Sequence, residues 1–551
     1  MDIDLFLCVY YNNIVYITWG VSVVMKRNIV GLVPMPTEKI TFKKNPNGTL
    51  YVYRIIRAYR NSNGKPTSDE VAIGKKDMKS GMLVPNARYF DYYHNDEPMQ
   101  NPPLAAKDYG NCKALELIAD KIGLTAIVAE TFPESWQELI TCSMYMACEG
   151  NVMMYINDWC DMTETPFGAT IDQRRCGELF TSISYDAMTE FFKEWIKVRS
   201  EQEYIAYDVT SISTSAQDID IAEWGHNRDD DNMQQINLGM YYGESSKIPV
   251  YYNVYNGSIP DKSCLSFMSE NAKSLGICNV RYVMDRGFMT ESNLKYMHDN
   301  TMPFIIPMPI SMVEARRLVD EYMKEIRIAG NWINKHEIYG HVYRWDLYGF
   351  PMHAHLYFSP DKCTDEEKKL HERVEKLAKE LESLSGKRIP KKYTDYFTIT
   401  KPPASQTSFE IDNRKFDEHL RRAGYFIFLT SDLKLSPLEL IDIYKNRDVI
   451  EKAFFDLKNN LDFRRLRTHS GKTTEGKIFV GFLALIMRSY ILSKIKASKA
   501  TERYSIEKVL LELKKIKVIN MADGRQILSV LTKTQKDVLS SLGLPESSFT
   551  I

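Results

Sequence analysis

The chain has 551 residues, enough for three or four domains at about 150 residues each. Hydrophobic residues make up 44% of it and charged residues 26%. This is the composition of a globular protein, and it excludes a disordered chain, a collagen-like repeat and a membrane bundle. The net charge of −1, from 71 basic and 72 acidic residues, argues by itself against a nucleic-acid partner.

The first 24 residues are apolar, but two aspartates precede the first basic residue, Lys26, which is unlike a signal peptide. Two asparagines interrupt the run, so it is also a poor membrane span. We interpret residues 1–25 as upstream sequence read in frame, with Met25 as the true start. The later apolar run Ile478–Met487 is too short to cross a bilayer, so we expect no membrane partner.

Nine cysteines are scattered from Cys8 to Cys363, and none forms a C-x-x-C pair or a zinc-finger spacing with histidine. Cys142, Cys148 and Cys160 lie in an apolar helical stretch. We therefore expect buried thiols in a reducing cytosol.

Residues 26–105 predict a strand-rich domain. The stretches TLYVYRIIRAYR (49–60) and DEVAIGKK (69–76), joined by the turn NSNGKP, are typical of a β-hairpin. Lysines and arginines make this piece basic: Lys43, Lys44, Arg54, Arg57, Arg60, Lys65, Lys75 and Lys76. Two interpretations stay open, a solvated edge kept soluble by charge or an arm that contacts DNA.

Apolar residues at helical spacing predict a helical domain over residues 106–200. Residues 201–300 then change character. Four strand-like stretches follow one another: EYIAYDVT, MQQINLGMYYG, IPVYYNVYNGS and VRYVMD. Because the last runs into helical sequence, the pattern indicates an α/β or α+β core.

Residues 301–440 are typical of an insertion, with strand-like VYRWDLYGFPMHAHLYF and YFIFLTS. Between them, Asp365–Ser385 is a charged helix with leucines at heptad-like spacing. This favours a helix that packs on its own domain over a dimerising coil. Residues 441–520 are again helical, and we expect residues 521–551 to form a small helical tail.

Two aspartates lie at strand positions that are otherwise apolar. Asp208 sits between Tyr207 and Val209, where a carboxylate costs desolvation free energy unless something binds it. Asp285 ends VRYVM, and ligand sites in open α/β sheets favour such strand ends. We expect Thr290 to cap the following helix. One buried aspartate is usually a turn or capping residue, but two on adjacent strands favour a shared site.

A third acid, Glu451, falls in DIYKNRDVIEKAFFDLKNNL (442–461), which the pattern predicts as one helix. At about 100° per residue, Tyr444, Arg447, Glu451 and Lys458 share an arc of about 60° beside an apolar stripe. The alternative is a ladder of ion pairs on a wet face. A carboxylate flanked by two cations and a phenol instead favours a site where a metal ion meets a phosphate backbone.

These motifs together resemble the DDE transposases of bacterial insertion sequences that carry the YREK signature. Tyr444, Arg447, Glu451 and Lys458 keep that signature's spacing, with two, three and six residues between them. YDVT around Asp208 and MDRGF around the second aspartate are similar to the family's two aspartate motifs. The resemblance runs from about residue 110 to the tail and, more loosely, includes the hairpin.

The resemblance implies an α/β fold in which a β-rich insertion (301–440) interrupts an RNase H-like catalytic core (201–300 and 441–520). A β-hairpin domain and a helical domain would precede this core. The implied activity is cut-and-paste transposition. The protein would bind the ends of an insertion sequence, cleave the DNA and join the 3′-hydroxyl ends to target DNA.

The resemblance also implies the roles of individual residues. Two divalent metal ions, Mg²⁺ or Mn²⁺, would be held by the catalytic acids Asp208, Asp285 and Glu451. DNA phosphates would be bound by Tyr444, Arg447 and Lys458. The partners would be double-stranded transposon ends and target DNA, held by a homodimer in the bacterial cytoplasm at the nucleoid.

Two other functions are compatible with these motifs: an RNase H-like nuclease without strand transfer, and a DNA-binding protein derived from a transposase that no longer cleaves. The signature and the long insertion favour the transposase, and all three acids are present. The charge distribution agrees. Residues 444–520 hold 18 lysines and arginines against eight acids, a local charge of +10, which leaves −11 on the rest.

Overall fold

The computed structural model describes residues 7–10, 13–18, 21–24, 33–37, 39–46, 48–61, 64–78, 80–89, 92–93, 103–199, 204–227, 231–277, 280–382, 390–400, 408–521 and 524–550. The chain divides into two compact units. The first comprises residues 1–107, 516–532 and 550–551, and the second residues 108–515 and 533–549. The finer domain boundaries expected at residues 200, 300, 440 and 520 stay predictions.

The first unit contains three sheets, ordered β1-β2-β3, β4-β5-β6-β7 and β21-β20-β8. Its elements are β1 (Leu7–Tyr10), β2 (Asn13–Thr18), β3 (Val21–Val24), β4 (Ile40–Lys44), β5 (Leu50–Arg60), β6 (Pro66–Lys76), β7 (Leu83–Pro85), η1 (Ala87–Tyr89), β8 (Pro103–Asp108), β20 (Lys517–Met521) and β21 (Gln526–Leu528). The first three strands fall in the segment we interpret as upstream sequence. Met25 lies outside the described residues, and that interpretation stays a prediction.

Strands β5 and β6 form the expected hairpin, paired antiparallel from Tyr51 opposite Lys75 to Arg60 opposite Pro66. Val52, Ile73 and Leu83 form its small core. Gly74 lets β7 approach, because a Cβ there would lie 2.2 Å from the carbonyl oxygen of Val84. The distal half of β5 is exposed, so the solvated edge and the DNA arm both remain open.

Residues 110–199 of the second unit are helical. They form α1 (Gly110–Lys121), α2 (Leu124–Thr131), α3 (Trp136–Glu149), η2 (Met153–Tyr155), α4 (Ile156–Met162), α5 (Gln173–Ser182) and α6 (Tyr185–Arg199). All of α3 from Glu138 to Ala147 is buried, so this helix lies at the centre of the group. Cys142, Cys148 and Cys160 are free thiols, as are the other four described cysteines.

A nine-stranded sheet forms the centre of the second unit, in the order β11-β10-β9-β12-β13-β19-β16-β15-β14. Its strands are β9 (Tyr204–Thr214), β10 (Gln234–Gly243), β11 (Pro249–Asn256), β12 (Arg281–Met284), β13 (Phe304–Met308), β14 (Trp332–Ile333), β15 (Ile338–Leu347), β16 (Phe350–Phe358) and β19 (Tyr425–Thr430). Strands β9, β10 and β11 are antiparallel neighbours, while β12 runs parallel to β9 and β13 parallel to β12.

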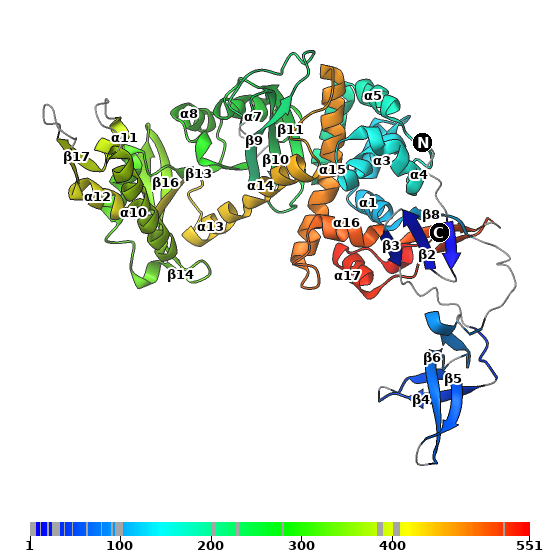
Figure 1. Ribbon diagram of the computed structural model, residues 1–551. Helices are drawn as coiled ribbons and strands as arrows, with labels where there is room; N and C mark the ends of the chain where they lie inside the picture. The colour runs from blue at the N-terminus through cyan, green and yellow to red at the C-terminus, as the bar shows by residue number, and fades with distance from the viewer. Residues whose placement is uncertain are drawn as a thin grey trace. The chain divides into compact units, whose positions relative to one another are not determined.

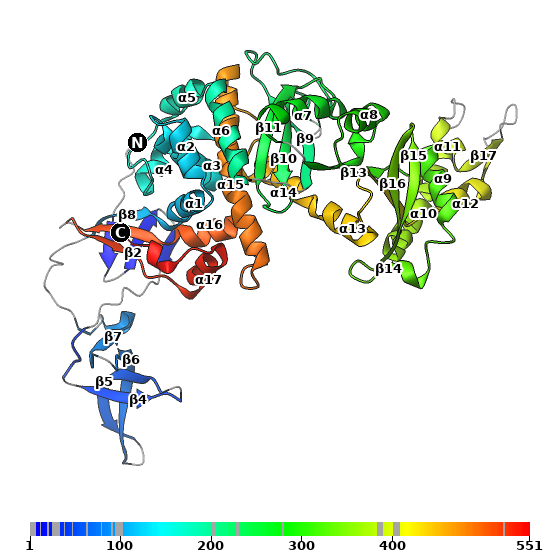
Figure 2. The same cartoon turned by 180° about the vertical axis from the view of Figure 1, so that it is seen from behind.

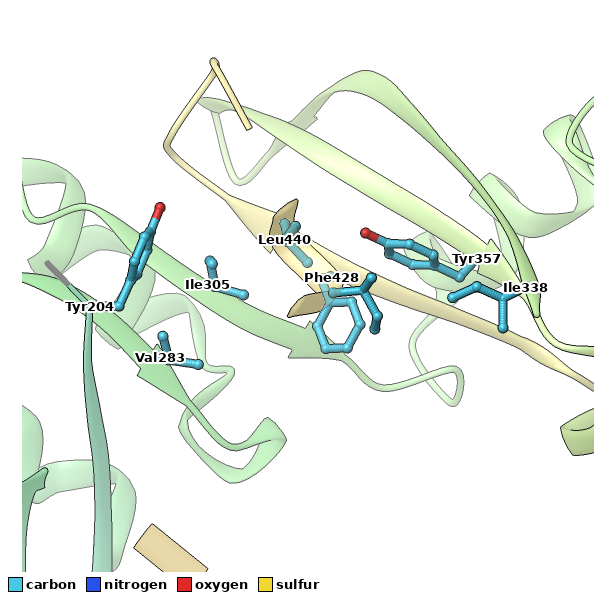
Figure 3. Packing of buried hydrophobic residues seen from close by; sticks show 8 residues of the cluster. Tyr204, Val283, Ile305, Ile338, Tyr357, Phe428 and Leu440 are labelled. Carbon is cyan, nitrogen blue, oxygen red and sulfur yellow. The ribbon is translucent and has the colours of Figure 1, made fainter. Parts of the chain in front are cut away.

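Most described strands of the expected insertion join the large sheet; only residues 397–400 and 408–411 pair in a small sheet of their own. β13 pairs with β12 on one side and with β19 on the other, so residues 301–440 continue the sheet that begins at β9. A single cluster of buried side chains runs along this join, from Tyr204 and Val283 to Tyr357 and Phe428, as Figure 3 shows. The mixed α/β class is therefore confirmed, while the insertion boundary stays a prediction.

The long helix α15 (Gly471–Ala497) packs on α3, α5 and β11 in the second unit, as both views show (Figures 1 and 2). Within the described residues it is the one helix long and apolar enough to cross a membrane, with a mean hydropathy of 1.7 over its best window. However, 83% of that window is buried inside the protein. The apolar run Ile478–Met487 is thus part of a 27-residue helix that is mostly covered by protein, and the absence of a membrane partner stays a prediction.

The remaining helices of the second unit surround the sheet and α15. They are η3 (Asp261–Ser263), α7 (Cys264–Ser274), η4 (Arg286–Phe288), α8 (Glu291–Asp299), α9 (Val313–Tyr322), η5 (Ala329–Asn331), α10 (Pro360–Glu382), α11 (Lys391–Thr394), α12 (Asn413–Leu420), α13 (Pro437–Asn446), α14 (Asp448–Phe455), the π-helical turn η6 (Asp456–Asn460), α16 (Ile506–Lys514), α17 (Lys533–Leu542) and η7 (Glu546–Ser548). A small sheet of β17 (Phe397–Thr400) and β18 (Ser408–Ile411) lies apart from the large one.

Two expectations about helices have clear outcomes. The apolar stripe of α10, including Val374, Leu377 and Leu381, packs on Tyr393 and Phe397 of its own chain, as favoured over a coiled coil. The tail after residue 520 is not wholly helical, because β21 precedes α17 and pairs with β20. The backbone N–H and C=O groups of these residues are paired between the two strands of a β-hairpin, which the helical prediction did not anticipate.

Candidate active site

Asp208 lies in the middle of β9, where all eleven residues are buried. The strand is central, with β10 on one side and β12 on the other. The Asp208 side chain is 8% exposed and accepts a hydrogen bond from the backbone N–H of Val209 at 2.8 Å. An acid at this depth keeps its charge only beside a compensating cation.

Asp285 directly follows β12, the parallel neighbour of β9. Met284 of β12 is the Cα partner of Tyr207 of β9. The residues that follow them, Asp285 and Asp208, therefore lie next to each other. The side chain of Asp285 is 44% exposed and accepts from the N–H of Arg286 at 2.7 Å. The helix that follows begins at the expected cap, because the hydroxyl of Thr290 accepts from the N–H of Asn293.

Glu451 comes from α14, which begins just after a break in the helix at Arg447. Helix α13 before this break is started by a capping box between Ser436 and Glu439. The side chain of Glu451 is 55% exposed and that of Arg447 is 7% exposed. The two are hydrogen-bonded one turn apart.

The three acids converge on the guanidinium of Arg447. Its Nη1 lies 3.7 Å from Oδ2 of Asp208 and its Nη2 lies 4.0 Å from Oδ1 of Asp285, in addition to the hydrogen bond with Glu451. Burial opposes the charge of Arg447, but the surrounding acids and the phenol of Tyr444 outweigh it and raise the pKa of the guanidinium. One buried cation thus lies within ion-pair distance of carboxylates from three separate elements and offsets part of their charge.

The ring of Tyr444 lies next to this guanidinium. Its ring centroid is 5.6 Å from Cζ of Arg447 and 4.3 Å from the ring centroid of Phe428 on β19. Burial raises the pKa of the Tyr444 hydroxyl, so the phenol stays protonated and can donate a hydrogen bond. Three members of the predicted signature are therefore brought together.

Lys458 does not lie on one continuous helix with Tyr444, Arg447 and Glu451, as the sequence pattern predicted. The segment 442–461 is α13, α14 and a π-helical turn, in which the N–H of Leu461 donates to the carbonyl of Asp456 five residues back. A π-helical turn does not keep the 100° per residue on which the expected arc depends. Lys458 is 8% exposed there, and its contact with DNA phosphate stays a prediction.

Sequence reasoning missed the ion pair that holds this turn. Arg488 of α15, 2% exposed, donates from Nε and Nη2 to the two carboxylate oxygens of Asp456 at 2.6 and 2.7 Å. It also donates to the carbonyl of Ala147 at 2.7 Å and to Glu507. The available signal was an arginine inside an apolar run, which requires a buried acceptor.

The donor set fits a divalent cation. The described residues contain no group of three or more His, Cys, Asp or Glu side chains already gathered to hold a metal. However, carboxylate oxygens are the ligands that Mg²⁺ prefers, and Nη1 of Arg447 is buried without a hydrogen-bond partner. A cation held by the three acids would replace the guanidinium as their counter-ion.

The fold and site together define a mixed α/β protein with acids on two adjacent strands and a following helix. Residues 199–487 match the family described as "Transposase DDE domain". That is more than half of the chain, so the protein belongs to this family, and the expected relation to DDE transposases is confirmed at that level.

No curated protein matches the chain. Among solved structures, it is similar to a piggyBac transposase in a cryo-EM structure of the synaptic complex with hairpin DNA. The TM-score is 0.31 and the sequence identity 11%, over 74% of this chain and 76% of that one. Such a distant similarity adds nothing to what the family match establishes.

Proposed function

We propose that this protein is the transposase of a bacterial insertion sequence with the YREK signature. It binds the ends of the element, cleaves DNA phosphodiester bonds and joins the 3′-hydroxyl ends to target DNA. The convergence of Asp208, Asp285 and Glu451 on one guanidinium carries the proposal. A concentration of negative charge drawn from three elements is stable only with a cation at its centre.

The proposed core is RNase H-like and is supported by the sheet order β11-β10-β9-β12-β13, with three antiparallel strands followed by two parallel ones. Asp208 on β9 and Asp285 after β12 lie at neighbouring positions in this sheet, and α14 supplies Glu451. The proposed cofactors are two Mg²⁺ or Mn²⁺ ions held by these acids. When bound, they would activate the attacking oxygen and stabilise the leaving one.

The residues of the signature have distinct proposed tasks. Arg447 neutralises the acids before the metal binds and afterwards turns to a DNA phosphate, which its planar fork suits. Tyr444 fixes the position of the guanidinium from behind and donates its O–H. Lys458 adds a cation close to Glu451 along the chain. The protein would act as a homodimer on two DNA ends, at the nucleoid in the cytoplasm.

The test is a cleavage and joining assay with the element's end DNA and Mg²⁺. Asp208→Asn, Asp285→Asn and Glu451→Gln should each reduce cleavage by at least about a thousandfold while leaving end-binding intact. Asp448→Asn is a matched control. This acid also lies on α14 but pairs with Lys452 at the surface, so the variant should retain activity.

The outcomes separate the alternatives. Cleavage without joining would identify an RNase H-like nuclease, and binding without either step would identify a DNA-binding derivative. Full joining activity in any one of the three acid variants would refute the assignment of the site.

A further inference from the structure

A cavity of about 1020 Å³ lies in the second unit, apart from the three acids. Its walls come from three places: the stretch around η2, one face of α5, and the end of β9 with the start of α15. This volume is at the upper end of the range for sites that bind small ligands. The cavity is therefore large enough to admit a nucleotide.

The wall from α15 carries a buried cation. Lys477 is 2% exposed, and its ammonium donates to the backbone carbonyl of Leu466 at 3.0 Å. No carboxylate of the described chain lies within ion-pair distance of it. Burial lowers the pKa of Lys477 to about 8, so the group is still charged at neutral pH. The ammonium has three N–H donors and one acceptor, the carbonyl of Leu466, so its other N–H groups can donate to a bound anion.

The other groups on the wall suit the same anion. Arg467 adds a second cation, which is shared with Asn151 and Asp462. The lining acid, Glu178, is already paired with Arg174 at 3.0 Å and with a second arginine. Residues with hydroxyl groups also line the cavity: Thr181, Thr214, Ser215, Thr468 and Thr473. The hydroxyls of Thr181, Thr468 and Thr473 already hydrogen-bond within the protein. Cations together with hydroxyl donors are the groups that bind phosphate oxygens in DNA complexes.

One strand joins this cavity to the acids. β9 carries Asp208 at its middle and Thr214 at the cavity, six residues or about 20 Å apart at 3.3 Å per residue. β12 pairs with the first residues of β9, and the basic segment 464–470 lies beside the later residues of the same strand. The N–H of Ser213 donates to Arg464 and its carbonyl accepts from Leu466. β9 and the basic segment beside it therefore connect the acids to the wall of the cavity.

We propose that this cavity binds a phosphate, with its nucleoside, of a DNA strand that continues from the three acids. The inference rests on the proposed function and adds a second contact with the same substrate. Lys477 and Arg467 hold the phosphate, and the threonine and serine hydroxyls complete its shell.

The test uses the full chain in metal-free buffer with a labelled single-stranded oligonucleotide of mixed sequence. Lys477→Met should weaken binding about tenfold and should make the slope of log affinity against log salt shallower by about 0.7. Lys472→Met is the matched control. It removes the same charge five residues earlier on α15, at an exposed position outside the cavity lining.

A second variant tests the space itself. Gly177 lines the cavity, and a Cβ there would meet no atom within 4 Å. Gly177→Phe should therefore fold and should weaken oligonucleotide binding to a similar extent. Its thermal midpoint serves as the control for folding.

Several outcomes overturn the inference. Unchanged affinity and salt slope in both variants would overturn it, while cleavage of end DNA by the wild type would show that the proposed function stands. If Lys477→Met abolishes binding of inorganic phosphate but not of the oligonucleotide, the cavity holds a free anion rather than DNA. A wild type that binds no DNA would overturn both proposals.

Discussion

At the scale of single residues, Arg447 is the centre of the candidate site. It is the common counter-ion of Asp208, Asp285 and Glu451, and its side chain is 7% exposed. Removing it leaves three acids facing one another, one of them buried. A bound divalent cation can take over this neutralising role, so the residue and the metal should be partly interchangeable in their effect on stability.

We expect Arg447→Met to destabilise the metal-free protein by about 2 kcal/mol, the size of a charged hydrogen bond. Added Mg²⁺ should then raise the thermal midpoint more in the variant than in the wild type. Thermal unfolding with EDTA and with Mg²⁺ measures both effects. If Mg²⁺ raises the thermal midpoint equally in both proteins, the metal does not replace the guanidinium as counter-ion of the three acids.

His355 of β16 provides a second test at this scale. It is fully buried, and neither ring nitrogen has a hydrogen-bond partner among the described residues. Burial, helped by His353 and His341, lowers the pKa of His355 to about 4. The unfolded chain therefore takes up the proton first as the pH falls.

Stability should accordingly be lost between pH 6.5 and about pH 4, by about 3 kcal/mol over that window. His355→Leu should remove this part of the pH dependence. The exposed His298 gives the control variant His298→Leu, which should follow the wild type. The midpoint of urea unfolding, measured from pH 7 to pH 4, checks the prediction. Parallel curves for His355→Leu and the wild type would contradict it.

At the scale of elements, the broken helix 437–460 matters most. A straight helix would place Lys458 two turns beyond Glu451 on the same face, but residues 456–460 form a π-helical turn in which Lys458 is buried. Asp456, at the start of that turn, is 5% exposed and is held by Arg488 from α15. This pair anchors the segment that carries Glu451 to α15, the longest helix among the described residues.

Arg488→Met should cost about 3–5 kcal/mol, because it leaves the carboxylate of Asp456 buried without a cation. The double variant with Asp456→Leu should recover much of that loss. Lys452→Met, which breaks the exposed pair with Asp448, should cost at most about 0.5 kcal/mol. Thermal unfolding of the four proteins measures these differences. If the double variant is no more stable than Arg488→Met, the unpaired carboxylate of Asp456 is not the cause of the destabilisation.

At the scale of the second unit, α15 organises the packing. Gly476 allows α5 to touch its backbone, since a Cβ there would lie 2.0 Å from the carbonyl oxygen of Phe180. Gly481 similarly accepts the ring of Phe463, which a Cβ would approach to 2.4 Å. Contacts with α3, α5 and β11 explain why a helix of this length is apolar on nearly every side.

We expect Gly476→Ala to destabilise the protein by about 2 kcal/mol, because the backbone of α5 cannot give way cheaply. Gly471→Ala, at the start of the same helix, meets no atom within 4 Å and should be neutral or slightly stabilising. Thermal unfolding compares the two. Equal midpoints would show that α5 moves freely to accept the methyl group.

Part of this structure could be predicted because the signals are local. Strand patterns identify β9 and β12, and the spacing of the signature identifies Tyr444, Arg447 and Glu451. The hairpin β5–β6 and the cap at Thr290 also follow from a few adjacent residues. The π-helical turn could not be predicted, because its stabilising partner, Arg488, lies 32 residues away in sequence.

The sequence by itself determined which residues carry charge, which stretches are strand-like or helix-like, and that three acids stand in the order of a DDE transposase. Only the tertiary structure decided that Arg447 lies among those acids, that Lys458 is buried, and that Lys477 faces a cavity. The physical reason is that contacts between distant segments depend on sheet order and close packing. Neither of these can be derived from the spacing of residues along the chain.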